Sequence, residues 1–247
     1  MVCLYMFCSL LLSPKRSKHL LQNNRLGPFH NPMVSGLSLD SGKTAKQLNE
    51  YLWVFPPNKL CNGSRSWWID CDPEPILIDC PPVSKNNIDL LEQLSSGRTA
   101  RIVLTNREAH GEIGDLQNAL GWPVLVQEQE AYLLPGLKKL ESFVDEHITE
   151  SGMRLIWTPG PTPGSCVAFA PEPLNVLFCG RLLIPKKSNF LVAVRTKRTF
   201  HWTRYQKSLT KIRQFMPLDV RPRLASGVGL NEAGGGKLYE WNEWINP

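Results

Sequence analysis

The spacing of apolar and polar residues predicts hairpin strands first and then an alternation of helices and strands. Between residues 51 and 79, short apolar runs are separated by turns rich in Pro, Asp and Asn, which is typical of neighbouring antiparallel strands. From residue 87 to 126, apolar residues at helical spacing alternate with short apolar runs, which indicates α/β units. The predicted strands here are Tyr51–Pro56, Ser66–Asp70, Ile76–Asp79, Arg101–Thr105 and Pro123–Val126, and the predicted helices are Asn87–Leu94 and Glu112–Leu120.

The rest of the chain continues this pattern after an acidic stretch at 128–150, which we expect to be partly helical. One amphipathic helix is predicted at Thr203–Phe215, with Leu209, Ile212 and Phe215 on its apolar side. We expect the bases on its other side to face solvent, because no aromatic residues are interleaved with them as in a nucleic-acid track. The four further predicted strands are Arg154–Thr158, Cys166–Ala170, Val176–Cys179 and Arg223–Ser226.

Length and charge indicate that the chain consists of an N-terminal leader and one domain. The 247 residues suit one large domain or two small ones. The formal charge is +6, from 28 Lys and Arg against 22 Asp and Glu, but four of the bases lie in residues 1–32, which contain no acid. We therefore expect a flexible or doubtful N-terminal leader at 1–47 and one domain at 48–247. Met33 as the true start and a targeting segment are the two alternatives for the leader.

Without its first 32 residues the chain carries 24 bases against 22 acids, which weakens the case for a nucleic-acid partner. No apolar run reaches the ~18 residues of a membrane-spanning helix. The seven cysteines include no C-x-x-C pair, which argues against a structural zinc site and provides no disulfide framework. We expect reduced thiols in a cytoplasmic protein.

Four sequence landmarks, in this order, resemble the metallo-β-lactamase superfamily. The first is the apolar run Ile76–Asp79, and the second is the strand Ile102–Thr105, followed by a loop and a helix that opens at Ile113. The third, Pro159–Ser165, reads P-G-P-T-P-G-S and differs by one residue from the P-G-H-T-P-G-S of that superfamily. The fourth, Val176–Arg181, ends L-F-C-G-R where the superfamily has L-F-T-G-D.

The resemblance implies an α/β fold, the four-layer α/β/β/α sandwich of two mixed β-sheets. It also implies a chemistry in which two metal ions, held by imidazoles and carboxylates, activate a bridging water. None of the positions that match the metal ligands retains the ligand of the superfamily, so we expect no zinc and no other cofactor. These vestigial metal-site positions are Asn106, Glu108, His110, Gly111, Pro161, Arg181 and Val228.

Arg181 places a permanent cation where the resemblance puts a metal-bridging carboxylate. We expect it to pair with Glu108 or Glu112. Two interpretations stay open: the pair is a structural ion pair, or Arg181 is the candidate anion-binding residue of a pocket. A single-metal site made of His110, Glu108, Glu112 and Asp115 is a third alternative, although one imidazole with carboxylates fits zinc poorly.

Other candidate chemistry is sparse. Cys179 precedes Gly180 at the expected cleft, but no base accompanies it, which favours an inert buried thiol. Ser165 lacks the G-x-S-x-G context of a nucleophile. Two pairs of acids are expected at a hairpin edge and on the surface rather than as acid/base pairs: Asp70 with Asp72, and Glu128 with Glu130.

We therefore expect a non-catalytic or catalytically degenerate protein of the metallo-β-lactamase type that binds a small ligand or a protein partner. A hydrolase of the ester or thioester type with a rearranged site is the first alternative. An RNA-associated protein is the second. The sequence leaves the ligand, the partner and the oligomeric state open.

Overall fold

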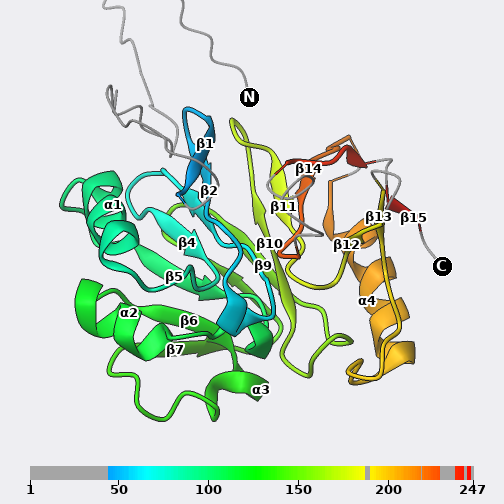
Figure 1. Ribbon diagram of the computed structural model, residues 1–247. Helices are drawn as coiled ribbons and strands as arrows, with labels where there is room; N and C mark the ends of the chain where they lie inside the picture. Colours follow the sequence, from blue (N-terminus) through cyan, green and yellow to red (C-terminus); the bar gives the residue numbers. More distant parts are fainter. Residues whose placement is uncertain (1–43, 187–189, 218, 229–236, 242–243, 246–247) are drawn as a thin grey trace, which may run out of the picture.

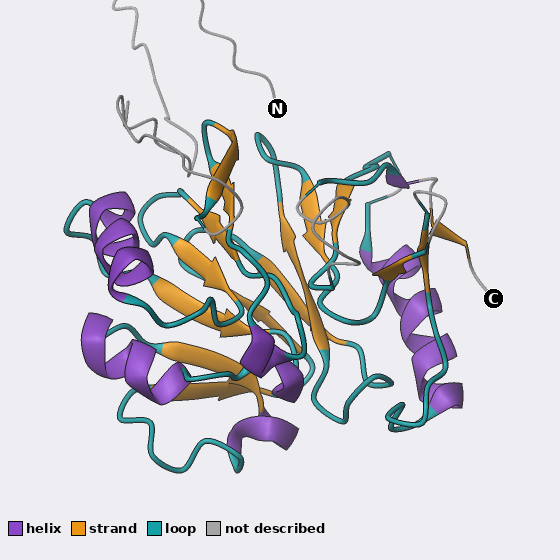
Figure 2. Ribbon diagram, in the orientation of Figure 1, coloured by secondary structure: helices purple, strands orange, loops and turns teal. Residues whose placement is uncertain are grey.

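The chain folds into four layers, a helical layer, two face-to-face sheets and a second helical layer (Figures 1 and 2). The computed structural model describes residues 44–186, 190–217, 219–228, 237–241 and 244–245. The predicted leader therefore lies outside the described residues except for its last four positions. The predicted α/β/β/α sandwich of two mixed sheets is confirmed.

The first sheet has seven strands in the order in which they occur in the chain. Its first four strands pair antiparallel, and from β4 onward the strands are parallel. The strands are β1 (Lys46–Asn49), β2 (Leu52–Val54), β3 (Trp67–Ile69), β4 (Ile76–Ile78), β5 (Arg101–Leu104), β6 (Val124–Gln127) and β7 (Leu140–Phe143).

The second sheet has the order β14-β11-β10-β9-β8, in which only the β11–β14 pair is parallel. A small third sheet has the order β12-β13-β15. The second-sheet strands are β8 (Glu146–Ile148), β9 (Arg154–Trp157), β10 (Cys166–Ala170), β11 (Val176–Phe178) and β14 (Arg223–Ala225). The third-sheet strands are β12 (Ile184–Pro185), β13 (Leu191–Val192) and β15 (Trp244–Ile245).

Three apolar cores lie between the four layers. The central core packs residues such as Trp67 and Val103 of the first sheet against residues such as Phe178 of the second. A second core lies between the first sheet and the helices α1 (Lys85–Ser95) and α2 (Ile113–Leu120). The third core lies between the second sheet and α4 (Trp202–Phe215). Strands buried on both faces, such as β4 and β5, explain why their sequences are continuous apolar runs rather than alternating ones.

The predicted helices and strands are all found, each within two residues of its expected bounds. The acidic stretch at 128–150 is the main departure. Only its first turn, α3 (Glu128–Ala131), is helical, and it continues as the edge strands β7 and β8. Pairing with β6 and β9 decides this structure over the local preference of its glutamates. Strands β1, β12, β13 and β15 were not predicted either.

In the described part of the chain, no helix combines the length and the apolar character that a bilayer crossing requires.

Candidate functional site

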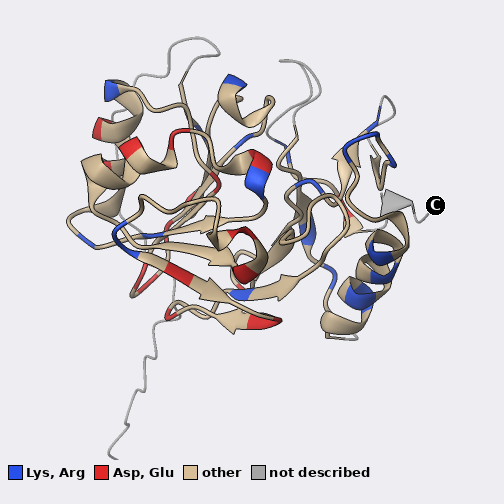
Figure 3. Cartoon of the chain, turned by 90° about the horizontal axis from the view of Figure 1, so that it is seen from below, with Lys and Arg blue, Asp and Glu red and all other residues tan. Residues whose placement is uncertain are grey.

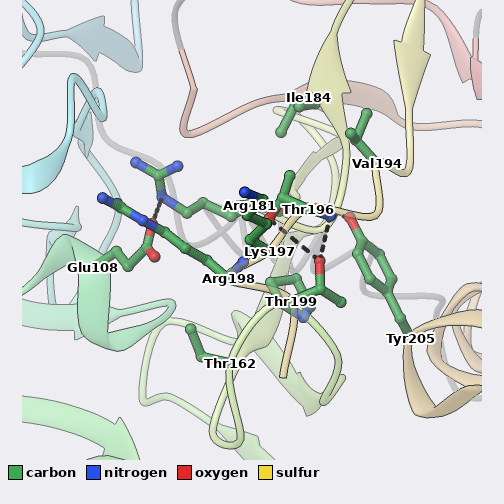
Figure 4. A pocket seen from close by; sticks show the side chains of 11 residues that line it. Glu108, Thr162, Arg181, Ile184, Val194, Thr196, Lys197, Arg198, Thr199 and Tyr205 are labelled. Carbon is green, nitrogen blue, oxygen red and sulfur yellow. Dashed lines mark hydrogen bonds and ion pairs between the residues drawn. The ribbon is translucent and has the colours of Figure 1, made fainter. Parts of the chain in front are cut away.

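Arg181 and Glu108 meet between loops that follow strands of different sheets. Arg181 follows β11, and Glu108 lies in the 3₁₀ helix η2 (Arg107–Ala109), which follows β5. Nε of Arg181 lies 2.9 Å from Oε2 of Glu108. The N–H does not point at this oxygen well enough for a hydrogen bond, so the contact is an ion pair (Figure 4). The structure thus pairs Arg181 with the first of the two carboxylates that the sequence suggested.

The guanidinium of Arg181 also binds the segment 61–64. Its Nη2 lies 3.1 Å from three acceptors, the carbonyl oxygens of Cys61 and Asn62 and the hydroxyl oxygen of Ser64. Hydrogen bonds from a charged donor contribute roughly 1.5–3 kcal/mol each when they are well formed. One side chain therefore ties a loop of the second sheet to two segments next to the first sheet.

A buried polar network lies beside this pair. The carboxylate of Asp79 accepts the backbone N–H of Thr105 at 2.7 Å and its hydroxyl at 2.8 Å. Asn106 donates from Nδ2 to Thr105 Oγ1, and its Oδ1 accepts the N–H of Glu108 at 3.0 Å. Burial raises the pKa of Asp79 to about 7, and the bonds from Thr105 and the charge of Arg181 oppose this rise. Asn106 therefore fixes the start of η2 and the backbone that carries Glu108.

His110 is half-buried and Gly111 is exposed, and neither is bonded to the ion pair by a side chain. Nε2 of His110 is buried without a hydrogen-bond partner among the described residues, and burial, with the charge of Arg107, lowers its pKa to about 4. His110 is therefore neutral near pH 7. Gly111 has a φ of +48°, and a Cβ there would lie 2.7 Å from Sγ of Cys61. Packing against Cys61 accounts for glycine at this position.

The two remaining positions that the sequence resemblance matches to metal ligands, Pro161 and Val228, lie in loops of the second sheet. The carbonyl of Pro161 accepts the N–H of Phe200 at 3.2 Å. Val228 forms a β-bridge with Ser64, and the hydroxyl oxygen of Ser64 accepts a hydrogen bond from Nη2 of Arg181. The seven positions thus follow the carboxyl ends of β5, β9, β11 and β14.

A pocket of about 350 Å³ opens beside the ion pair (Figure 4). Its cations are Arg181, Lys197 and Arg198, and its only acid is Glu108. Lys197 and Arg198 are exposed, and Nη1 of Arg198 is held by Oδ1 of Asn62 at 3.3 Å. The pocket is lined by Glu108, Pro161, Thr162, Arg181, Ile184, Val194, Thr196, Lys197, Arg198, Thr199 and Tyr205.

Solved structures decide the identity of the fold. The metallo-β-lactamase VMB-1 superposes with a TM-score of 0.62 at 19% identity, over 81% of this chain and 93% of that one. The metallo-β-lactamase of Pontibacter korlensis gives 0.59 at 16% identity, over 81% and 94%. An archaeal metallo-β-lactamase superfamily protein of Sulfolobus tokodaii gives 0.53 at 17%, over 72% and 76%. The chain has the metallo-β-lactamase fold. Searches with protein-family models and with curated protein sequences gave no match.

The residues of this metallo-β-lactamase fold do not fit the metal pair that the sequence resemblance implies. Pro161 and Gly111 have no donor side chain, and Arg181 places a cation where a bridging carboxylate would have to lie. Glu108 is already neutralised by Arg181. Within the described ranges, no three His, Cys, Asp or Glu side chains are grouped to hold a metal ion, so the single-metal alternative is not formed.

Two site residues of this metallo-β-lactamase fold were not predicted, Lys197 and Arg198. They lie in the loop between β13 and α4, which carries no motif. A turn orders the loop, since the N–H of Thr196 donates to Oγ1 of Thr199 at 2.8 Å and the N–H of Arg198 donates to Oγ1 of Thr196 at 3.1 Å. The run of bases Arg195, Lys197 and Arg198 was the only signal in the sequence.

Two acids that the sequence placed at a hairpin edge and on the surface, Asp70 and Glu130, are both buried. Asp70 is 1% exposed and pairs with Arg98, because β3 ends inside the sandwich. Glu130 is also 1% exposed, and its Oε1 accepts the N–H of Gly164 at 3.0 Å. Burial raises the pKa of Glu130. Through its bond to Gly164, Glu130 anchors the loop that contains Pro161, and it does not line the pocket.

The two candidate nucleophiles are both buried. Cys179 is fully buried, and burial raises its pKa far above that of an exposed thiol. The hydroxyl of Ser165 lies 2.7 Å from that of Thr162 and accepts the N–H of Thr162. Ser165 therefore shapes the P-G-P-T-P-G-S turn. Neither residue lines the pocket.

Proposed function

We propose that this protein is a ligand-binding member of the metallo-β-lactamase fold that does not carry out binuclear metal hydrolysis and that holds a small anion beside Arg181. The observation that carries the proposal is the ion pair between Arg181 and Glu108 at 2.9 Å. It puts a guanidinium among the positions that resemble metal ligands, and it ties up the one carboxylate that lines the pocket.

The charge of the pocket supports an anionic ligand. Glu108 neutralises one of three cations, so an excess of two positive charges faces about 350 Å³ of space. Pockets of roughly 300–1,000 Å³ hold small molecules, with a few polar groups that fix their orientation. Ile184 and Val194 add apolar wall, which suits a ligand with an organic part.

Arg181 has two roles in this proposal. Its Nη2 and Nε are committed to the segment 61–64 and to Glu108. No partner of its Nη1 is found in the described part of the chain. The two interpretations of the sequence are therefore compatible, because the same residue holds the loops together and faces the pocket.

Metal content and anion binding test the proposal together. We expect purified protein, incubated with zinc and then dialysed, to retain well below one zinc ion per chain, and its esterase and thioesterase activity to be unchanged by a chelator. We also expect a small anion such as benzoate or phenyl phosphate to bind to the wild type and more weakly to Lys197→Ala. Lys207→Ala, an exposed base of α4 that is not in the pocket, is the matched control. One or two zinc ions per chain, lost together with hydrolysis on chelation, would overturn the proposal.

A polyanionic partner is the second candidate, because the bases are not evenly spread. Residues 173–218 contain ten Lys and Arg and no Asp or Glu. Phe200, which is 45% exposed, adds an aromatic ring next to Lys197 and Arg198 in sequence. Retention of single-stranded RNA that weakens steeply with salt would favour this candidate. Binding of small anions without RNA retention would leave the first proposal alone.

A further inference from the structure

The inference concerns the ligand class and rests on the proposed function. We propose that the pocket takes the dianionic phosphate group of a small phosphorylated molecule, with Lys197 and Arg198 as the residues that contact it. The charge balance points to this class. Two positive charges remain after Glu108 has neutralised Arg181, and a phosphate monoester carries close to two negative charges above its second pKa of about 6. A carboxylate or sulfate ester compensates only one of them.

The donors of the loop suit phosphate oxygens. Arg198 offers a planar fork that matches phosphate, and Lys197 offers a compact point charge. Thr196 and Thr199 each accept a backbone N–H on their hydroxyl oxygen. Their hydroxyl groups are within 3.4 Å of each other, so one proton at least remains for a ligand oxygen. Both bases line the pocket, and the side chain of Arg198 extends toward Glu108 (Figure 4).

The surroundings also favour a multiply charged anion. In Figure 3 the helix α4 carries basic segments and no acidic one, and its sequence agrees. Arg195, Arg204 and Lys207 are exposed near the loop in sequence. A surface of one sign raises the local concentration of the opposite ion, and the effect scales with the charge of the ligand. A dianion gains more from this field than a monoanion.

Apolar walls accommodate the rest of the ligand. Ile184 and Val194 line the pocket, and Tyr205 lines it with a hydroxyl that is already donated to the carbonyl of Leu182 at 2.6 Å. These side chains offer apolar contact area and no free hydrogen-bond donor that a ligand would have to satisfy. A phosphate on a small organic group therefore fits the pocket better than inorganic phosphate alone.

Calorimetric titration with phenyl phosphate and phenyl sulfate at pH 8 and low salt tests this assignment, because the two probes share shape and differ in charge. We expect phenyl phosphate to bind about tenfold or more tightly than phenyl sulfate. We expect the preference to fall to about twofold or less in the double variant Lys197→Ala/Arg198→Ala. Both bases are exposed, so thermal unfolding should show that the variant remains folded.

The outcomes separate the ligand class from the proposed function. Equal binding of the two probes overturns the phosphate assignment and leaves small-anion binding intact. Binding of neither probe overturns both. A preference for phenyl phosphate that survives in the double variant, while Lys207→Ala abolishes it, places the anion outside the pocket and overturns the assignment as well.

Discussion

From residue 44 onward the chain divides into two parts of opposite net charge, which we name the first or acidic half (44–172) and the second or basic half (173–247). Residues 44–172 contain ten bases and seventeen acids, whereas residues 173–247 contain thirteen bases and four acids. In the first half, bases are matched nearby, as where Arg101 binds Glu74 and Arg98 binds Asp70. Arg181 of the second half instead reaches across to Glu108 of the first. A nearly neutral total thus conceals two oppositely charged parts, and the pocket lies where they meet.

This contrast separates two uses of arginine. Arg101 of β5 and Arg98 of the loop before β5 pair with buried carboxylates at the edge of the first sheet, where neutrality is the main requirement. Among the described residues, no acid forms an ion pair with Lys197 or Arg198. Both bases are exposed and line the pocket. Positive charge that is left uncompensated beside a cavity is available for a ligand.

The largest effect should come from breaking a charge pair inside the acidic half. Nε of Arg101 lies 2.9 Å and 3.0 Å from the two carboxylate oxygens of Glu74, which is 7% exposed. Arg101→Ala leaves this carboxylate buried without its cation and should lower the free energy of unfolding by about 3–5 kcal/mol in urea titrations.

The matched control for that pair is Glu141→Gln. Glu141 also binds Arg101, but its side chain is 50% exposed, so its loss should cost less than about 1 kcal/mol. If Arg101→Ala and Glu141→Gln lost equal stability, the burial of Glu74 would not explain the cost of breaking its ion pair.

The contact that joins the halves should matter next. Arg181→Ala removes the ion pair with Glu108 and the bonds to the segment 61–64, so we expect a loss of about 2–3 kcal/mol. Glu108→Gln removes only the ion pair, which is partly exposed, and should cost about 1 kcal/mol. A double-mutant cycle with urea unfolding measures their coupling, and a coupling energy of zero would contradict a structural role for the pair.

The buried acid beside Arg181 predicts a dependence of stability on pH. The pKa of Asp79 is raised from 3.8 to about 7 on folding, so the folded state holds a proton that the unfolded state has released. The stabilisation is complete below about pH 4 and is lost as the pH rises through about 7, at about 1.4 kcal/mol per pH unit within this window. Asp79→Asn should flatten the profile between pH 4.5 and 6.5.

Glu130 provides the comparison for this measurement. Its pKa is raised in the same direction, so its slope has the same sign and remains in the Asp79→Asn variant. Unfolding curves at several pH values for wild type and variant isolate Asp79 as a difference. Parallel profiles would show that Asp79 is ionised in the folded protein throughout the window.

The layers of the fold were predictable because local pattern and burial agree there. Ile76–Asp79 and Arg101–Thr105 read as apolar runs, and both become central strands with buried faces on each side. The stretch 128–150 was not predictable, because β7 and β8 are largely exposed edge strands whose sequence has no alternating pattern. Only their pairing with β6 and β9 specifies them.

The candidate site divides in the same way. Arg181 and Glu108 were identified because they lie at fixed positions in motifs that follow strands, and the structure brings them to 2.9 Å. That these are vestigial ligand positions stays a prediction. Lys197 and Arg198 could not be found, because the path of their loop depends on β13 and α4 packing against the second sheet. The burial of Glu130 depends in turn on the loop of Gly164, which lies 34 residues away.

The smallest effect concerns the excess of bases on α4 of the basic half. Arg204 is exposed in the first turn of this helix, where its charge opposes the positive end of the helix dipole. Arg204→Glu should therefore stabilise the protein by about 0.5–1 kcal/mol in urea unfolding. Arg213 lies in the last turn, where a base is favourable, so Arg213→Glu should destabilise by a similar amount. Lys207 lies in the middle of the helix, where the helix dipole has little effect. The change in stability of Lys207→Glu therefore measures only the relief of repulsion among the bases. If all three reversals stabilised the protein equally, crowding of like charges alone would govern the basic half, and the helix termini would contribute nothing.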